Sequence, residues 1–174
     1  VTELCTGVMI FLFNRTILRC IGTDGLVSYH YGKDDQVGCR SLLGYGLKTV
    51  AALTPVLFVF LYLLAPQIVR LFLNNADGAL IASSAAAFRR YSISYLMVGT
   101  NIFISGFLTA LERPMPAICI SVGRGLVVQS ACLLALAAIF GGSAIWDTPV
   151  ISEAICLVLS MVFLRQYRKS ARAA

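Results

Sequence analysis

The stretch TVAALTPVLFVFLYLLAPQIV, residues 49–69, decides the fold class of this chain. Its 21 residues include no aspartate, glutamate, lysine or arginine, and most of its side chains are apolar. A helix needs about 20 apolar residues to cross the hydrocarbon core of a bilayer. Residues 58–64 lack the alternation of apolar and polar side chains that strands of a membrane β-barrel show. The stretch therefore predicts a transmembrane helix.

The composition of the whole chain agrees with a membrane protein. The chain has 174 residues, of which 59% are hydrophobic and 13% are charged. Soluble domains carry about 25% charged residues, so this chain has too few charges to cover a surface that faces water. The composition excludes a typical cytosolic enzyme, a disordered chain and a disulfide-rich secreted module. The length leaves room for four or five membrane helices.

Other stretches of low charge predict the remaining helices. Residues 91–111 and 125–146 contain no charged side chain, and a shorter stretch near the C-terminus contains one, Glu153. The prediction is weakest for the N-terminal stretch, residues 1–21, because Arg15 and Arg19 follow its apolar residues. We predict an all-α fold, a polytopic membrane helix bundle of about four to five transmembrane helices. These helices are expected near residues 1–21, 47–73, 88–111, 122–141 and 149–167.

The charges of the loops predict the orientation in the membrane. The C-terminal tail carries four basic residues and no acidic one, so the positive-inside rule places the C-terminus in the cytoplasm. The loop with Arg113 and Arg124 is then also inside, whereas the segment from Arg70 to Arg90 is outside, against the rule. The net charge of +6 needs no nucleic-acid partner, because cytoplasmic loops and anionic lipid headgroups account for it. We predict a multi-pass protein of the plasma membrane with the lipid bilayer as its partner.

The sequence offers no set of residues for enzymatic chemistry. The six cysteines form no C-x-x-C pair, and His30 is the single histidine. One histidine without clustered ligands cannot build a catalytic triad or a zinc site. No glycine-rich phosphate-binding loop is present. We therefore expect no enzyme, no bound metal and no cofactor.

Polar residues within the apolar stretches are the candidates for function. Glu3 precedes the first apolar run, Asn14 ends it, and Asn101 lies midway along residues 91–111. A polar group in lipid is costly unless it faces protein or a wet cavity, so these three residues are candidates for an ion or substrate pathway. Hydrogen bonding between helices is the alternative, or exposure at the membrane surface in the case of Glu3.

Several short runs, in a fixed order, carry a resemblance to a known family. They are FRRYS (88–92), GFLTALERP (106–114), ISVGRG (120–125), FG (140–141), IW (145–146) and PVISE (149–153), preceded by SYHYG (28–32), LAPQIVRLF (64–72) and residues 2–14. Together they resemble the multidrug and toxic compound extrusion (MATE) family of cation-coupled efflux transporters. That family has twelve helices in two six-helix lobes around a central cavity. The resemblance implies that residues 1–174 are a partial C-terminal lobe. It lacks a counterpart of the eighth helix, because three residues stand between Asp24 and Ser28.

The resemblance implies a mechanism as well as a fold. It implies an antiporter that exports organic cations or drugs by alternating access across the bacterial cytoplasmic (inner) membrane, with Na⁺ or H⁺ as the coupling ion. Sodium-coupled relatives use acidic side chains in the seventh and tenth helices. Glu3 falls near the first of these positions and the neutral Asn101 near the second. The implied partners are an organic cation and either the missing N-terminal lobe or a second copy of the chain.

Two alternatives remain open at this point. The chain could be a lipid-linked sugar flippase of the same superfamily, or a non-transporting membrane remnant. At 174 residues it is shorter than the transporter it resembles, so we expect no transport by this chain alone. Family topology places the start of the seventh helix inside, whereas five spans with a cytoplasmic C-terminus place it outside. We therefore expect residues 1–21 to insert inverted or to pack abnormally.

Overall fold

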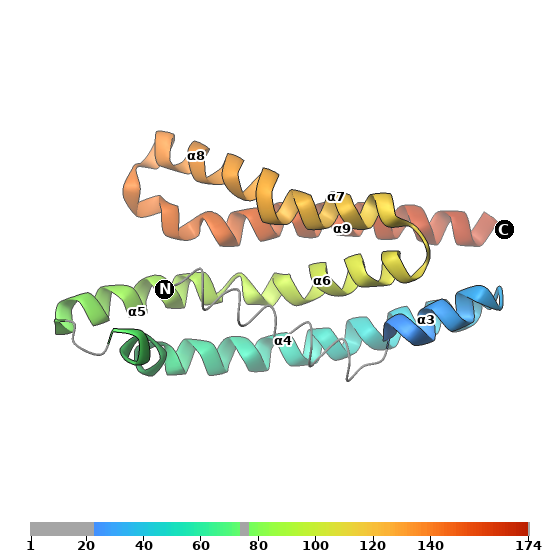
Figure 1. Ribbon diagram of the computed structural model, residues 1–174, viewed down its shortest axis with the longest axis horizontal. Helices are drawn as coiled ribbons and strands as arrows, with labels where there is room; N and C mark the ends of the chain where they lie inside the picture. The colour runs from blue at the N-terminus through green and yellow to red at the C-terminus, as the bar shows by residue number, and fades with distance from the viewer. Residues whose placement is uncertain (1–22, 74–76, 174) are drawn as a thin grey trace.

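The computed structural model describes residues 23–73 and 77–173, and this part of the chain is helical without any strand. The all-α prediction is confirmed. The predicted helix near residues 1–21 lies outside the described residues. Figure 1 shows long antiparallel helices that lie side by side. They are α3 (Thr23–Gly32), α4 (Gln36–Phe72), α5 (Gly78–Ser92), α6 (Tyr95–Ala110), α7 (Pro114–Val122), the π-helical turn η2 (Gly123–Val127), α8 (Val128–Phe140), the 3₁₀ helix η3 (Gly142–Asp147) and α9 (Thr148–Ala173).

Within the described residues, three helices are long and apolar enough to cross a membrane. They are Gln36–Phe72, Pro114–Phe140 and Ile145–Lys169. α5 and α6 form a fourth candidate span, which is bent by 42° between the two helices. The described part of the chain is therefore a polytopic membrane bundle with three to four candidate spans.

α4 is longer than the sequence predicted. The expected helix covered residues 47–73, whereas α4 begins at Gln36. The Asp35 carboxylate caps this start by accepting a hydrogen bond from the backbone N–H of Gly38 at 2.8 Å. With 37 residues the helix is about 55 Å long, well beyond the roughly 30 Å hydrocarbon core. Basic residues near its start can therefore lie outside the hydrocarbon core while still belonging to the helix.

The segment from Arg70 to Arg90, which the charge pattern predicts on the outer side, is mostly helix. α5 occupies residues 78–92, and the expected helix over 88–111 is divided between α5 and α6. The Arg89 guanidinium lies over the Tyr62 ring of α4, 5.3 Å from its centroid, and its Nε donates to the Tyr62 carbonyl at 3.3 Å. These contacts, and the favourable position of a cation in the last turn of a helix, let a charged residue remain in helical structure.

The helix predicted over 122–141 begins earlier as well. α7 starts at Pro114, with proline in the first turn where no backbone N–H is needed. Residues 123–127 continue it as a π-helical turn into α8. Arg124 is therefore inside a membrane helix and not in the predicted cytoplasmic loop. α9 begins at Thr148, one residue before the predicted start of the last helix.

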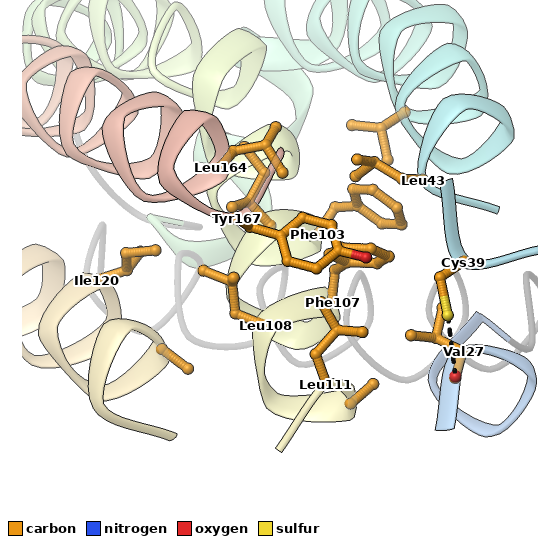
Figure 2. Close-up of a cluster of buried hydrophobic side chains, with 14 residues drawn as sticks. Val27, Cys39, Leu43, Phe103, Phe107, Leu108, Leu111, Ile120, Leu164 and Tyr167 are labelled. Carbon is orange, nitrogen blue, oxygen red and sulfur yellow. Dashed lines mark hydrogen bonds between the residues drawn. The ribbon is translucent and has the colours of Figure 1, made fainter. Parts of the chain in front are cut away.

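α6 is the central helix of the bundle. It lies between α4 and α9 in Figure 1, and ten of its 16 residues are buried. Figure 2 shows the larger core cluster, in which the rings of Phe103, Phe107 and Tyr167 meet Leu43 of α4. Phe103 and Phe107 stack with ring centroids 6.3 Å apart, and Phe107 meets Tyr167 edge-on at 5.6 Å. This core holds α6 in a fixed position between its neighbours.

A second core cluster joins the other half of α4 to α5 and the start of α6. Its members are buried apolar residues such as Leu61, Ala65, Phe88 and Tyr95. In contrast, α8 has no buried residue. α6 is therefore well packed, whereas the η2–α8 part of the neighbouring span has no buried residue.

Candidate functional site

Asn101, in the middle of α6, is the centre of a buried polar cluster. Its side chain is fully buried. The amide Nδ2 donates to the Glu153 carboxylate Oε2 at 2.8 Å and to the Glu153 backbone carbonyl at 3.1 Å. Its Oδ1 accepts a hydrogen bond from the Ser160 hydroxyl at 3.0 Å. One amide group thus joins α6 to two positions of α9 that lie about two turns apart.

Glu153 supplies the carboxylate of this cluster. The residue is 8% exposed and lies within the candidate span Ile145–Lys169. Its second oxygen, Oε1, lies 3.5 Å from Nη1 of Arg124. An ionised group inside a membrane protein is costly unless it is paired or faces a wet cavity. The Asn101 amide and the Arg124 guanidinium provide that pairing.

Arg124 reaches this carboxylate from the π-helical turn η2. π-helical turns are rare and occur often at functional sites. The Arg124 side chain is 19% exposed and lines a cavity of about 220 Å³ between α6 and the α7–η2 helix. Asn101 lines the same cavity together with the hydroxyl-bearing residues Ser105, Thr109 and Ser121. The cluster is therefore open to a small polar space.

Helical periodicity explains how the sequence assembles this site. Asn101 and Ser105 are four residues apart on α6 and share one face. Glu153, Cys156 and Ser160 follow one another at helical spacing on α9, and all three are buried. The Ser105 hydroxyl bonds to the Ser121 hydroxyl at 3.0 Å and donates to the Ala117 carbonyl at 3.2 Å. α6 is thereby bonded to both α9 and α7.

The cluster has the chemistry to bind a small cation. Carboxylate, amide and hydroxyl oxygens are the ligands that hard cations such as Na⁺ and Mg²⁺ prefer, and a carboxylate can also take up a proton. Among residues 23–73 and 77–173, no three histidine, cysteine or acidic side chains are grouped as metal ligands. Glu153 therefore acts here as a lone carboxylate, which suits a monovalent cation.

The structure brings one predicted site residue into this cluster. Asn101 is there, whereas Glu3 and Asn14 lie outside the described residues. The sequence interpretation missed Glu153 and Arg124 as site residues. The signal for Glu153 was present, because it is the one charged residue in an otherwise apolar stretch, and such a residue indicates function. Its pairing with Asn101, 52 residues away, cannot be deduced from local spacing.

A second, apolar cavity lies near the other end of the helices. It has a volume of about 450 Å³ and lies between the end of α4, α5 and η3. Phe72, Phe88 and Trp146 supply aromatic walls, and Ser83 and Ser84 supply hydroxyl groups. Cavities of this size with few polar groups suit small apolar or aromatic ligands.

Comparison with known proteins places the chain in a family. No curated protein and no solved structure matches it significantly. The model of the family described as MatE matches residues 1–131, which is about three quarters of the chain. The match covers the described helices α3 to α7 and the π-helical turn that carries Arg124. The chain therefore belongs to the MatE family of membrane transporters, as its motifs predicted.

Proposed function

We propose that this chain takes part in cation-coupled antiport, in which organic cations or drugs leave the cell by alternating access. The coupling ion is Na⁺ or H⁺, and the membrane is the bacterial cytoplasmic (inner) membrane with the C-terminus inside. The observation that carries this proposal is the buried carboxylate of Glu153, bonded to Asn101 between two membrane helices. Membership of a transporter family supports it.

Antiport needs a site that one cation leaves before another cation binds. A carboxylate meets this requirement, because its negative charge can be neutralised by a proton, by Na⁺ or by a substrate cation. Asn101 orients one carboxylate oxygen and leaves the other facing Arg124. In this proposal Glu153 binds the coupling ion, and Asn101 positions it and coordinates. Glu3 and Asn14 remain candidates for the same pathway.

The apolar cavity at the other end of the bundle supports the proposed substrate class. Organic cations combine a positive charge with apolar rings, and Phe72, Phe88 and Trp146 provide aromatic surface for such rings. We propose that an N-terminal lobe, or a second copy of the chain, provides the other half of the transport pathway.

The test is transport of a fluorescent organic cation by the chain in proteoliposomes, alone and with a co-expressed N-terminal MATE lobe. We expect dye movement driven by a Na⁺ or pH gradient only when both halves are present. Glu153→Gln should abolish the coupling, whereas Glu112→Gln, at an exposed acid after α6, should not alter it.

Other outcomes would support other functions. Good membrane insertion without dye movement under either condition would favour a non-transporting membrane protein. Movement of a fluorescent lipid-linked sugar, with no effect of an ion gradient, would favour a flippase. Coupled transport that survives Glu153→Gln would remove this carboxylate from the mechanism.

A further inference from the structure

The ion pair between Arg124 and Glu153 is weaker than a buried structural pair. Arginine and carboxylate groups commonly pair through two parallel hydrogen bonds of about 2.7–2.9 Å. Here the pair has a single contact, Nη1 to Oε1, at 3.5 Å. The short bond to the carboxylate comes from Asn101 at 2.8 Å. Glu153 is therefore held in place by Asn101, and Arg124 contributes charge more than position.

Arg124 also has a space into which its charge can move. Its side chain lines the 220 Å³ cavity whose other polar walls include Asn101, Ser105 and Ser121. A water molecule occupies about 30 Å³ of liquid, so this cavity can hold water around a displaced guanidinium. The guanidinium extends from the cavity wall to the carboxylate. A cation that enters through the cavity meets Arg124 next to Glu153.

The backbone at this point is suited to rearrangement. Arg124 lies between Gly123 and Gly125 in the π-helical turn. A Cβ atom at Gly125 would meet no other atom within 4 Å, so the turn is not packed tightly there. None of the five residues of η2 is buried. In contrast, Asn101 and Glu153 are both buried.

No other cation faces Glu153 among the described contacts. Besides Arg124, the titratable group near it is the thiol of Cys156 on the same helix, and the thiol of Cys132 on α8 lies near Cys156. From α6 the Asn101 amide faces Glu153, and this amide also accepts a hydrogen bond from the Ser160 hydroxyl of α9. The guanidinium of Arg124 is thus the charge that neutralises the carboxylate.

We propose that Arg124 is a tethered competitor for the coupling cation at Glu153, an inference that rests on the proposed function. When the site holds neither Na⁺ nor an added proton, Arg124 neutralises the carboxylate. When a coupling cation binds, the guanidinium moves into the hydroxyl-lined cavity. Its positive charge then repels an organic cation from the same space, so the two cations bind in alternation. Exclusive binding of this kind is what antiport requires.

The experiment follows the reactivity of Glu153 in the full chain, reconstituted in liposomes, with dicyclohexylcarbodiimide. This apolar reagent modifies protonated carboxyl groups, and a bound cation protects them. Mass spectrometry of the peptide that contains Glu153 gives the extent of labelling at increasing Na⁺ concentration. The variants are Arg124→Gln, which removes the charge at similar size, and Arg124→Lys, which keeps it on a shorter and less well-matched group. Arg90→Gln, at an exposed arginine of α5, is the matched control.

Removal of the tethered cation should strengthen Na⁺ binding. We expect half-protection of Glu153 in Arg124→Gln at an Na⁺ concentration about tenfold lower than in the unmodified chain, a change that corresponds to about 1.4 kcal/mol. Labelling without Na⁺ should also be faster. The Na⁺ concentration for half-protection in Arg124→Lys should lie between those of Arg124→Gln and the unmodified chain. If Arg124→Gln does not give monodisperse protein, Arg124→Lys is compared with the unmodified chain instead. Arg90→Gln should match the unmodified chain.

The two possible failures can be told apart. If Na⁺ protects Glu153 equally well in all Arg124 variants, the competitor role is wrong while ion binding at Glu153 stands. If Na⁺ protects Glu153 in no variant and Glu153→Gln keeps coupled transport, the proposed function is wrong together with this inference.

Discussion

At the scale of single residues, the amide of Asn101 joins α6 to α9. It donates twice to Glu153 and accepts once from Ser160. An amide can do this because it carries donors and acceptors in one group. An aspartate at this position would have only acceptors and would place a second negative charge beside Glu153. The asparagine therefore suits this partner better than an acidic side chain would.

Replacement of Asn101 by alanine should destabilise the bundle. Two buried groups, the Glu153 carboxylate and the Ser160 hydroxyl, would lose a partner, at a cost of about 1–3 kcal/mol. Thermal unfolding in detergent measures the effect. The matched control is Ser83→Ala, whose hydroxyl bonds at an exposed position to the Leu80 carbonyl. Equal melting temperatures for the two variants would contradict the linking role of Asn101.

Asp35 gives a second prediction at this scale. The backbone N–H of Gly38, and then the His30 side chain at 2.8 Å, hold the pKa of this carboxyl below its usual range. A lowered pKa means that the ionised form stabilises the fold. This stabilisation is present above the unfolded pKa of about 3.9 and is lost as the pH falls through the lower folded pKa.

Asp35→Asn should therefore lower the melting temperature at pH 7, and the difference should shrink below pH 4. Unfolding curves in detergent at pH 7, 5 and 3 measure this dependence. Asp77→Asn is the matched control, since Asp77 caps α5 without a side-chain hydrogen bond. A difference for Asp35→Asn that stays constant across this range would contradict the assignment.

The residue scale also shows what the sequence could predict of the site. A polar residue in an apolar stretch was enough to identify Asn101, because burial of an amide in a membrane needs a partner. The partner itself lies on a helix 52 residues away. Helical periodicity predicts which residues of one helix share a face, but not which face of α9 meets α6. The sequence does not identify Arg124 as a site residue, because a charged residue is more common in a loop than inside a membrane helix.

At the scale of elements, α4 and α6 approach each other closely at one glycine. Gly46 is buried, and a Cβ atom there would overlap the Phe103 ring of α6. Gly44, two residues earlier on the same helix, has open space at the corresponding position. The contact at Gly46 lies beside the stacked rings of Phe103 and Phe107, in the core shown in Figure 2.

Gly46→Ala and Gly44→Ala should consequently have opposite effects. The first should push Phe103 from its place and destabilise the bundle by about 1–3 kcal/mol. The second should leave stability unchanged or raise it by up to about 1 kcal/mol, because alanine favours a helix over glycine. Melting temperatures of the two variants under the same conditions decide the matter. Similar losses of stability in both variants would contradict a close approach of α4 to α6 at Gly46.

The elements show why helix boundaries were harder to predict than helices. Each predicted membrane helix in the described part has a counterpart. However, α4, α5 and α7 each begin before the charge-free stretch from which the corresponding span was predicted. The predicted spans were limited to charge-free stretches, because charged residues usually indicate loops between membrane helices. In the structure Arg89 lies over the Tyr62 ring, and Arg124 faces Glu153. Both arginines remain helical because another helix supplies a partner, and that partner is a tertiary feature.

At the scale of the whole molecule, one end of the bundle carries more basic residues than the other, where Arg70 ends α4. Figure 1 places α3, the start of α4, the loop between α6 and α7, and the C-terminus at one end of the bundle. The end of α4, the start of α5 and η3 are at the other end. The first end includes Lys33, Arg113 and the basic tail, whereas residues 141–147 contain no lysine or arginine. By the positive-inside rule, the first end should face the cytoplasm.

Reporter fusions test this orientation. Green fluorescent protein after Ala174 should fluoresce, and alkaline phosphatase there should be inactive, because the C-terminus is expected inside. Alkaline phosphatase fused after Gly142 should be active, because the loop before α9 is expected outside. Fusions after Arg113 should behave like those at the C-terminus. Active phosphatase after Ala174 would reverse the proposed orientation.

The π-helical turn at residues 123–127 also sets the rotational phase of its span. A π turn holds one residue more than an α turn, and one residue corresponds to about 100° of rotation. Every side chain of α8 is therefore offset by more than a quarter of a revolution from the direction that an unbroken helix from Pro114 would give it. Because of this additional residue, Ser121 and Arg124 face α6 and α9, whereas the side chains of α8 face a different side than they would on an unbroken helix. The face that a whole membrane helix presents to its neighbours thus depends on one additional residue in the turn.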